Sequence, residues 1–453
     1  MDASWLFAAA CAVLFATGCT ETVVACAKDG SCPAGNHCVA GLCQSGTLAA
    51  AAQPDVQAPS NAADTKTLIC DPNLAGGPSP RGDLAGGFVG GRLAIVYGDD
   101  GAPVQCQPAP HATEDVWWFD PCQGWQAMTG TLPPPRTRAA SASDAKNGFL
   151  YVYGGRYRAA ASGAYTVRGD LWRLDGKSGA WLQLNDGTGG PPARSNAVLA
   201  LRPGDGTLVL HGGNSSSDGA SFDPLGDVWT YQAAAGAWSK QATTGTAPAA
   251  RLFHAGAITA DDKYLVIFAG GDANAFQGPF FRDVWRLDLT TWAWQKLQGQ
   301  GDVPMGRIKS GLLAVPGQAR LLLFGGHDDG SVGNRNDLWW LDPETGDFTA
   351  AHIGDLGAAN DPNVPFKNPK AFCDFPSDFT QIDKEAPERR EAFLWDYDPA
   401  TKKVWMFGGQ SDCGDLRDVW TLDPATLKWE VVDDTPKGWS CERYLSPCST
   451  LCN

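Results

Sequence analysis

Six short apolar runs recur along the chain, and five of them end on a pair of glycines. They read YVYGG (151–155), LVLHGG (208–213), VIFAGG (266–271), LLLFGG (321–326) and VWMFGG (404–409), and a degenerate first copy reads IVYGD (95–99). Apolar runs of this length are typical of buried β-strands. Because glycine tolerates positive φ and close backbone approach, the Gly-Gly pair predicts a special backbone conformation where each strand ends.

Each apolar run lies within a longer repeat that has fixed polar and aromatic positions. An Asp-x-Trp motif follows the run, and its tryptophans are Trp117, Trp172, Trp229, Trp285, Trp339 and Trp420, at intervals of 55, 57, 56, 54 and 81 residues. A Pro-x-x-Arg motif precedes the run and ends at Arg81, Arg136, Arg194, Arg251, Arg307 and Arg390. A second aromatic follows eight or nine residues after each tryptophan: Trp125, Trp181, Trp238, Trp294, Phe348 and Trp429. This regularity predicts six copies of one structural unit.

Every copy contains four short apolar stretches separated by turns. In the third copy they read NAVLAL, TLVLHGG, DVWTYQ and AWSKQ. A four-stranded antiparallel sheet cannot bury both of its faces alone, whereas several sheets arranged radially bury them against each other. The pattern therefore predicts an all-β propeller with six blades, in which the two aromatic positions fill the space between blades.

These motifs, at this period, resemble kelch repeats over residues 78–432. The resemblance implies a six-bladed kelch β-propeller whose first strand in each blade is innermost. Each copy runs from its own Pro-x-x-Arg to its own last strand, so closure of the ring needs no strand exchanged between the two ends. Residues 352–386 lack the motifs and are interpreted as an insertion between blades five and six. The motif arginines are expected to be structural and to tie blade to blade.

Composition supports a folded all-β protein and excludes some partners. The chain has 453 residues, of which 54 are glycine and 18 are tryptophan, and its formal net charge is −15. Many glycines with many aromatics favour tight turns between short strands. Nucleic acids and anionic lipid surfaces bind basic proteins, so no nucleic-acid partner is expected.

The first residues favour export. Residues 1–18 contain an apolar stretch too short to span a bilayer, which is typical of a secretory signal. The ending Ala16-Thr17-Gly18-Cys19 resembles a bacterial lipobox, which implies cleavage and acylation of Cys19. We therefore expect a lipoprotein of the outer membrane or cell surface, contacting the membrane through this lipid. Without acylation the protein is expected to be secreted or periplasmic.

The cysteines also fit an oxidising compartment. The sequence has 14, and removing Cys11 of the signal and Cys19 leaves an even number. Residues 19–43 predict a small disulfide knot whose connectivity stays open, built from Cys26, Cys32, Cys38 and Cys43. Residues 44–77 predict a flexible linker, and residues 433–453 form a cysteine-containing tail. Strand parity within a blade suggests the pairs Cys70–Cys106 and Cys373–Cys413, and a tail cysteine is expected near Cys122.

The kelch resemblance also locates a candidate binding site. In kelch substrate adaptors, positions just after Pro-x-x-Arg and just after Gly-Gly contact the ligand at one mouth of the central channel. The first set here is Asp83, Arg138, Asn196, His254, Lys309 and Glu391. The second set is Asp99, Arg156, Asn214, Asp272, His327 and Gln410. The loops that follow carry aromatics expected to be exposed: Tyr157, Tyr165, Phe222, Phe276, Phe280 and Phe281.

Catalytic interpretations are weaker. His254 and His327 lack a defined third metal ligand, so no metal and no cofactor are expected. Copper-radical oxidases resembling galactose oxidase have seven blades and a Tyr-His pair, which this sequence lacks. The sequence predicts a module that binds a protein or a glycan, and it leaves enzymatic activity open without favouring it. The alternative is a small-molecule enzyme of the sialic acid mutarotase type, with Asp83, Arg138, His254 or Glu391 as acid or base. A carboxylate with a perturbed pKa in the mouth would favour the enzyme, whereas a wide aromatic rim would favour binding.

Overall fold

The computed structural model describes most of the predicted propeller and short parts of the N-terminal region. The described residues are 24–25, 36–39, 42–45, 74–100, 111–160, 162–218, 221–233, 235–328, 333–357, 379–381, 383, 385–411 and 414–434. Lipidation of Cys19 and the predicted pairs Cys70–Cys106 and Cys373–Cys413 lie outside them. The chain divides into two compact units, Met1–Lys66 and Thr67–Asn453. No described helix is long and apolar enough to cross a membrane.

The first unit contains a small antiparallel sheet within the cysteine-rich segment. Its strands are β1 (Val24–Ala25), β2 (Asn36–Val39) and β3 (Leu42–Ser45), in the order β1-β3-β2. Cys38 lies opposite Cys43 in the pairing of β2 with β3. Cys26 and Cys32 lie outside the described residues, so the predicted knot stays a prediction.

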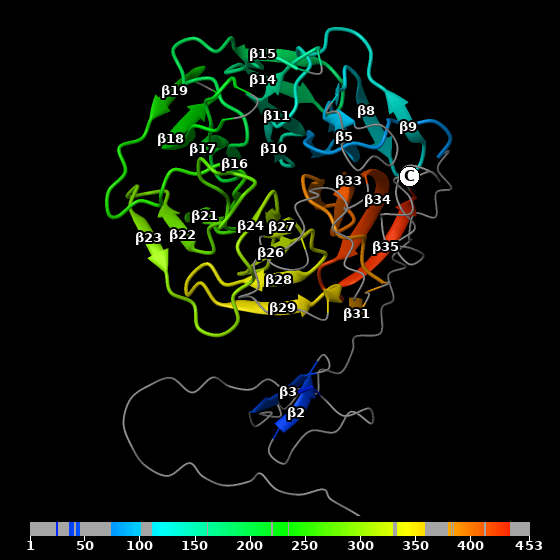
Figure 1. The fold of residues 1–453 in the computed structure, drawn as a ribbon. Coiled ribbons are helices and arrows are strands. Elements are labelled where there is room, and N and C mark those ends of the chain that lie inside the picture. Colours follow the sequence, from blue (N-terminus) through cyan, green and yellow to red (C-terminus); the bar gives the residue numbers. More distant parts are fainter. Residues whose placement is uncertain are drawn as a thin grey trace, which may run out of the picture. The chain divides into compact units, whose positions relative to one another are not determined.

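The second unit consists of six four-stranded antiparallel blades arranged around an axis (Figure 1). Blade 1 contains β4 (Ala85–Val89), β5 (Arg92–Val96), β8 (Val116–Asp120) and β9 (Gly124–Ala127). Blade 2 contains β10 (Ala140–Asp144), β11 (Phe149–Tyr153), β14 (Leu171–Asp175) and β15 (Trp181–Asn185). Blade 3 contains β16 (Val198–Arg202), β17 (Thr207–Asn214), β18 (Pro224–Gln232) and β19 (Ala237–Lys240). Each blade comes from one continuous stretch of sequence.

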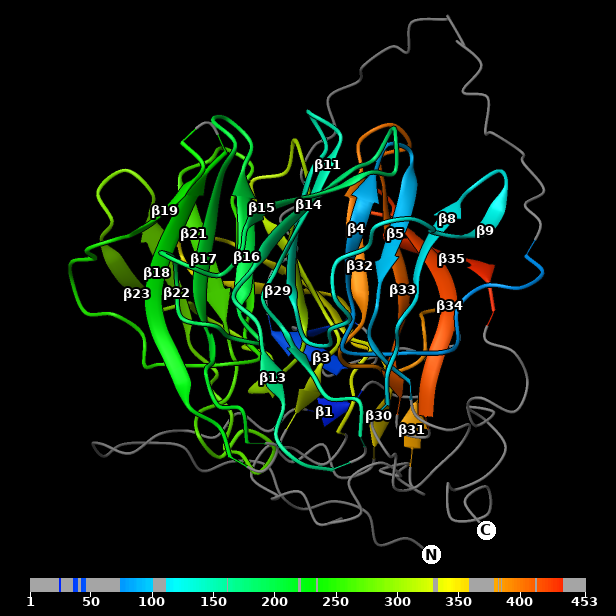
Figure 2. The same cartoon turned by 90° about the horizontal axis from the view of Figure 1, so that it is seen from above.

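The other three blades repeat the same order. Blade 4 contains β20 (Ala255–Ile258), β21 (Tyr264–Phe268), β22 (Val284–Asp288) and β23 (Trp294–Leu297). Blade 5 contains β25 (Gly311–Ala314), β26 (Leu321–Phe324), β28 (Leu338–Leu341) and β29 (Phe348–His352). Blade 6 contains β32 (Leu394–Asp398), β33 (Lys403–Ser411), β34 (Gly414–Asp423) and β35 (Lys428–Asp433). Figure 2 shows the strands running between the two faces of the ring.

Four two-stranded ribbons lie outside the blades. Two connect the second and third strands of a blade, one pairs the entry of blade 5 with the segment after its second strand, and one lies within the insertion. They are β6 (Asp99–Asp100) with β7 (His111–Ala112), β12 (Arg156–Tyr157) with β13 (Thr166–Val167), β24 (Arg307–Ile308) with β27 (His327–Asp328), and β30 (Leu356–Gly357) with β31 (Phe379–Gln381). The last pair lies within the predicted insertion, and residues 358–378 between its strands are not described.

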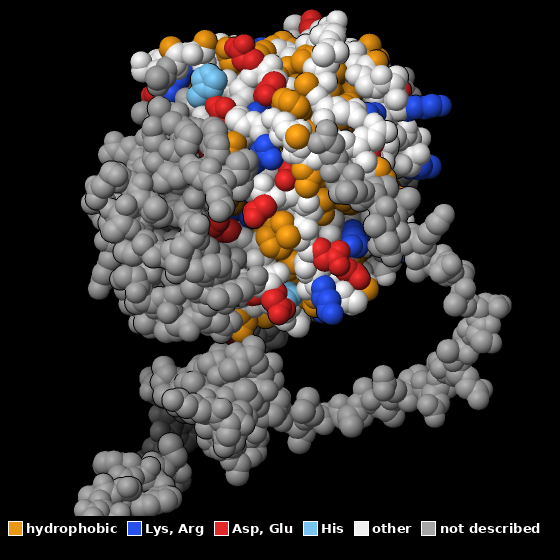
Figure 3. Space-filling model, turned by 90° about the vertical axis from the view of Figure 1, so that its right-hand side faces the viewer, with side chains coloured by type: hydrophobic (Ala, Val, Ile, Leu, Met, Phe, Trp, Pro, Cys, Tyr) orange, Lys and Arg blue, Asp and Glu red, His pale blue; other side chains and the backbone are white. Residues whose placement is uncertain are grey.

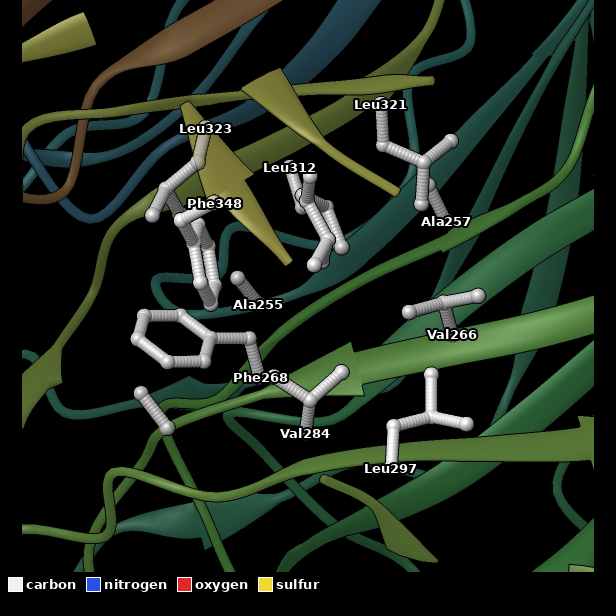
Figure 4. Close-up of a cluster of buried hydrophobic side chains, with 12 residues drawn as sticks. Ala255, Ala257, Val266, Phe268, Val284, Leu297, Leu312, Leu321, Leu323 and Phe348 are labelled. Atoms are coloured by element: carbon white, nitrogen blue, oxygen red, sulfur yellow. The ribbon is translucent and has the colours of Figure 1, made fainter. Parts of the chain in front are cut away.

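Apolar side chains pack between neighbouring blades, as the sequence predicts. Figure 4 shows the cluster between blades 4 and 5, where Phe268 of β21 packs against Phe348 of β29 with ring centroids 5.0 Å apart. Phe348 is the second aromatic of the fifth copy. Burying an aromatic of this size removes a large apolar area from water and stabilises the blade interface by a few kcal/mol, about 1.5–3 for such a side chain.

In every blade the motif arginine pairs with the Asp of the Asp-x-Trp motif, and we call this buried contact the motif latch. Arg194, whose side chain is fully buried, donates to both carboxylate oxygens of Asp227 at 2.6 and 3.0 Å, and Trp229 Nε1 donates to the same carboxylate at 2.7 Å. The side chain therefore joins strands of one blade, which corrects the prediction that it ties blade to blade. The backbone carbonyl of Arg194 makes the inter-blade contact, because it accepts the N–H of Gly155 in blade 2 at 2.9 Å.

The ring closes between blades 6 and 1 without strand exchange. Arg81 of blade 1 accepts the N–H of Gly409 at 2.9 Å, which repeats the contact between the other blades. Trp125 Nε1 donates to Asp433 at 2.7 Å, and Phe88 N donates to Asp396 at 2.7 Å. The outer edges of these two blades lie on the side shown in Figure 3, where acidic, basic and apolar side chains are interspersed among the described residues.

Candidate functional site

The residue two positions after each motif arginine belongs to a closed ring at one mouth of the channel. The six residues are Asp83, Arg138, Asn196, Phe253, Lys309 and Ala392, and their φ angles lie between 50 and 57°. Each donates its backbone N–H to the carbonyl of the ring residue in the preceding blade, over N···O distances of 2.7 to 3.3 Å. Asp83 donates to Ala392 and completes the circle. The positive φ turns the chain so that this hydrogen bond and the start of the inner strand are both possible.

A second set of residues lies beside this ring, as strand parity predicts. The residue directly after each motif arginine pairs with the residue directly after the Gly-Gly pair, or after the two residues that take its place. The pairing is an isolated β-bridge or a short ribbon. The pairs are Gly82 with Asp99, Thr137 with Arg156, Ser195 with Asn214, Leu252 with Gly271, Ile308 with His327, and Glu391 with Gln410. The first set lines a cavity of about 200 Å³ at the mouth, and the second set is joined to it by these backbone pairs.

Three predicted residues stand one position away from the place that the resemblance assigned to them. Phe253, and not His254, occupies the first set in blade 4, and Ala392, and not Glu391, occupies it in blade 6. Gly271, and not Asp272, occupies the second set in blade 4. Gly271 takes this place because the two preceding residues, Ala269 and Gly270, have φ of 63 and 97° and so adopt the conformation of the two glycines in other blades.

His254 is directed between blades and contacts another histidine. Its Nε2 lies 2.9 Å from Nδ1 of His211, and the two rings meet edge to face. Burial, together with the positive charge of Arg251, lowers the pKa of His211 to about 3. Burial and His211 hold the pKa of His254 well below its ordinary value. Both imidazoles are therefore neutral at pH 7, which suits packing more than proton transfer to a ligand.

Charged side chains from four blades meet across the mouth. Arg138 Nε donates to Asp83 at 2.6 Å. Lys309 Nζ lies 3.3 Å from Asp83 and 3.1 Å from Glu391, and it donates to Gln410 at 3.2 Å. Burial alone would raise the pKa of Asp83, but Arg138 and Lys309 hold it far below the ordinary value. Asp83 is thus a fully compensated carboxylate.

Two other charged residues of the mouth lack such partners. Among the described residues, Nε and Nη1 of Arg156 and Nη1 of Arg138 are buried donors without an acceptor, and Oδ1 of Asp99 is a buried acceptor without a donor. Burial and the negative charge of Asp83 raise the pKa of Asp99 to about 6. Burial and the positive charge of Arg138 lower the pKa of Arg156 to about 10. Buried polar atoms without partners are costly, and in a cavity they indicate a place for a ligand or ordered water.

Aromatic side chains border the charged network on the side of blades 3 and 4. Phe222, Phe253 and Phe276 form a cluster with centroid distances of 5.2 to 6.0 Å. Phe276 is 48% exposed. Arg138 and Lys309 lie 5.7 and 5.4 Å from its ring centroid. The mouth therefore combines desolvated charges of both signs with an exposed aromatic rim.

Comparison with known proteins identifies the family of this site and fold. The model of the KLHDC2/KLHL20/DRC7 Kelch-repeats domain matches residues 88–318, about half of the chain. The chain belongs to the kelch-repeat family. Its propeller and its motif latches are accordingly kelch features, whereas the charges at the mouth vary from blade to blade within this one molecule.

Several curated relatives share part of the kelch region. Acyl-CoA-binding domain-containing protein 5 of Arabidopsis thaliana is 28% identical over 263 residues, which cover 56% of this chain and 38% of the relative. Multiple epidermal growth factor-like domains protein 8 of Mus musculus is 27% identical over 238 residues, which cover 48% of this chain and 8% of the relative. Host cell factor of Drosophila melanogaster is 27% identical over 197 residues, which cover 38% of this chain and 13% of the relative. The matches span less than two thirds of each of these relatives.

The remaining predicted residues of this kelch mouth are engaged in local contacts. Asn214 Oδ1 accepts the N–H groups of Ser216 and Asp223, at 3.2 and 2.7 Å. Asn196 Nδ2 donates to Ser195 at 3.1 Å, and a ring nitrogen of His327 lies 3.1 Å from Asn334 Oδ1. Of these residues, Asn196 lines the cavity, and the binding role of all of them stays a prediction. Of the six loop aromatics that were predicted to be exposed, only Phe276 is exposed and Phe280 is buried. The other four are half-buried: Tyr157, Tyr165, Phe222 and Phe281.

Sequence reasoning missed Phe253, which belongs to the first set of mouth residues. Phe253 follows Leu252 in what reads as a plain apolar pair, and only its φ of 57° turns it into the ring. Tyr165 lies over Arg156, with the guanidinium 3.8 Å from its ring centroid, and its N–H donates to Ser217 at 2.8 Å. Counting exactly two residues from each motif arginine would have found Phe253, whereas Tyr165 is one of the loop aromatics that the sequence predicts.

The channel behind the mouth is lined by the inner strands and has a cavity volume of about 420 Å³. Its main charged group is Asp396, which accepts hydrogen bonds from Phe88 N and Ser143 Oγ. Burial raises the pKa of Asp396. Within the part of the chain that the structure describes, no group of three or more metal-binding side chains comes together.

Proposed function

We propose that this kelch propeller is a protein-binding module whose partner docks at the channel mouth and places a carboxylate against Arg138 and Arg156. The observation that carries the proposal is the set of buried guanidinium N–H groups without acceptors on these two arginines. Planar guanidinium groups bind carboxylates with paired, charge-assisted hydrogen bonds, and these are strongest where water is excluded.

The aromatic rim supports a protein partner over a small free anion. Phe276 is exposed beside the desolvated cations, and it packs on Phe222 and Phe253. Interfaces between proteins are enriched in aromatic residues and arginine at their buried centres, where a few such side chains dominate the binding energy. A partner segment that carries one acid next to an apolar side chain would fit both features.

The proposal can be tested with peptides selected against the full chain. A displayed peptide library is panned on the protein, and the best binder is resynthesised with each Glu or Asp replaced by its amide. We expect Arg156→Gln to weaken binding at least tenfold, because the substitution removes the guanidinium group whose Nε and Nη1 have no acceptor among the described residues. The amide peptide should lose a similar amount.

The matched control is Arg202→Gln, which lies at the far end of β16 and pairs with Asp205 at the surface. It should leave binding unchanged. Equal binding by wild type, Arg156→Gln and Phe276→Ala would place the interface elsewhere and contradict the proposal.

We further propose that the protein works outside the cytoplasm, tethered by the predicted lipid on Cys19. The supporting observation is that Cys122, at the turn after β8, is disulfide-bonded. Structural disulfides persist in oxidising compartments. Metabolic labelling with a radioactive fatty acid should mark the wild-type chain but not Cys19→Ser, and an unlabelled wild type would refute the anchor.

One observation favours the small-molecule enzyme as a second candidate function. Asp99 is a buried carboxylate in the mouth whose pKa is raised to about 6, which is the range of a general acid or base. Proton NMR of anomer exchange in sialic acid distinguishes the two functions. Acceleration by the wild type that Asp99→Asn abolishes would support catalysis, whereas no acceleration leaves the binding module.

A further inference from the structure

We propose that Asp99 is a further ligand-binding residue of the channel mouth, and that it binds the partner's anionic group as a neutral acid after taking up one proton. This inference rests on the proposed carboxylate site and adds a residue and a regulation to it. The sequence places Asp99 in the second set of predicted binding residues but does not distinguish it from the other members of that set.

The backbone holds Asp99 at the mouth. Its N–H donates to Gly82 at 2.8 Å and its carbonyl accepts the N–H of Gly82 at 3.0 Å, directly beside ring residue Asp83. The corresponding position of blade 2 is Arg156, one of the two arginines of the proposed site. Asp99 is only 7% exposed, and its Oδ1 accepts no hydrogen bond among the described residues. One oxygen of the carboxylate is therefore buried without a donor among the described residues.

The surrounding charges leave Asp99 without a cation of its own. The groups that interact with it electrostatically are Asp83, Arg138, Lys309 and Arg156. Arg138 and Lys309 are both engaged with Asp83, and Lys309 also contacts Glu391. The neighbouring Asp100 is different, because it accepts from Ser79 at 2.6 Å and contacts His111 at 2.7 Å.

Proton uptake follows from placing a second anion in this network. An ionised Asp99 can only accept hydrogen bonds, so it repels a carboxylate that approaches Arg156. A protonated Asp99 donates an O–H to that carboxylate, which replaces the repulsion by a charge-assisted hydrogen bond. One proton passes from solvent to Asp99 on binding and returns to solvent on dissociation, so the balance is complete. Since Asp99 already has a raised pKa, this proton is available near neutral pH.

The test uses a probe whose own charge does not change. The acid of the selected peptide is replaced by cysteic acid, a sulfonate that stays ionised, and binding to the full chain is measured by calorimetry between pH 7.5 and pH 5.5. We expect the affinity to rise as pH falls, by up to about tenfold per pH unit for one linked proton. Measurements in two buffers of different ionisation enthalpy should show uptake of close to one proton at pH 7.

Variants assign the proton to Asp99. Asp99→Asn retains the size and supplies an N–H donor, so it should bind as tightly at pH 7.5 as the wild type does at pH 5.5, with no proton uptake. The control His111→Gln replaces a histidine of β7 that belongs to neither set of mouth residues, and it should keep the wild-type pH dependence.

The outcomes separate this inference from the proposed function. Binding that is independent of pH, or pH dependence that persists in Asp99→Asn, overturns the role of Asp99 and leaves the arginine site intact. Absence of binding by both the carboxylate and the sulfonate peptide at every pH refutes the arginine site, and the inference falls with it.

Discussion

Asp83 and Asp99 are both buried carboxylates at the same mouth, yet their environments move their pKa values in opposite directions. Two cations contact Asp83 and lower its pKa, whereas Asp99 has no cation of its own and faces the negative charge of Asp83. Burial penalises the charged form of both groups, so the presence of a partner decides the sign. One residue is consequently a structural anchor and the other a candidate for function.

The histidine pair between blades 3 and 4 should make the stability of the protein depend on pH. The pKa of His211 in the fold is about 3, below the ordinary value near 6.5, so the unfolded chain binds more protons between these pH values. Stability should therefore fall as pH drops from about 6.5 toward 3. Replacing His211 by Phe, the residue at this position in blades 4, 5 and 6, should reduce the loss between pH 7.5 and pH 5 by roughly 2 kcal/mol.

Urea unfolding at the two pH values measures this effect. His111→Gln is the control, because His111 is exposed on β7 and packs in no core. Identical pH dependence in His211→Phe and wild type would show that the pair does not exclude protons.

At the scale of the element, each blade is held by one arginine that satisfies several acceptors at once. Arg194 donates to Asp227, to the carbonyl of Gly212 at 3.0 Å and to the carbonyl of Pro192 at 3.1 Å. The Pro-x-x-Arg, Gly-Gly and Asp-x-Trp motifs are therefore three parts of a single contact. Their spacing recurs because the strand lengths between them are fixed by the width of the blade.

Removing one arginine should destabilise the protein strongly. Arg194→Ala leaves the Asp227 carboxylate without its cation in a largely buried site, and loss of one partner of a buried ion pair costs about 3–5 kcal/mol. The control Arg202→Ala breaks only the surface pair with Asp205 and should change stability by less than about 1 kcal/mol. Thermal unfolding of both variants checks the difference, and Arg194→Lys should recover only part of it because lysine lacks the bidentate geometry. Equal melting temperatures for the two alanine variants would contradict the latch.

At the scale of the whole molecule, closure depends on contacts between the two ends of the propeller. Trp125 of blade 1 packs against Phe407 of blade 6 at a centroid distance of 5.5 Å and donates to Asp433. Trp429 packs in the same way against Phe324 of blade 5, at 5.1 Å, but its Nε1 has no partner among the described residues.

Comparing the two tryptophans isolates the closing hydrogen bond. Trp125→Phe and Trp429→Phe remove similar volume, but only the first removes a hydrogen bond to a buried carboxylate, and it leaves Asp433 with the longer contact of 3.4 Å from Arg417 Nη2. We expect Trp125→Phe to cost about 1–3 kcal/mol more in urea unfolding. It should also speed amide exchange in β9 and β35, whereas equal losses in the two variants would mean that Asp433 does not help to close the ring.

The sequence by itself determined the fold to the level of individual strands. In the third copy, the four predicted stretches correspond to β16, β17, β18 and β19. This succeeded because apolar runs, glycine pairs and motif arginines act locally and repeat six times. Strand parity also placed the two sets of mouth residues together, since successive antiparallel strands begin and end on alternate faces.

Only the tertiary structure decided which side chains meet at the mouth. Phe253 and Ala392, each two residues after a motif arginine, take the positions in the ring that the prediction gave to His254 and Glu391, and their positive φ sets this offset. The pairing of His211 with His254, and the isolation of Asp99 from the cations around it, depend on contacts between blades. Such contacts arise from the curvature of the ring and the directions of side chains, which no spacing along the chain records.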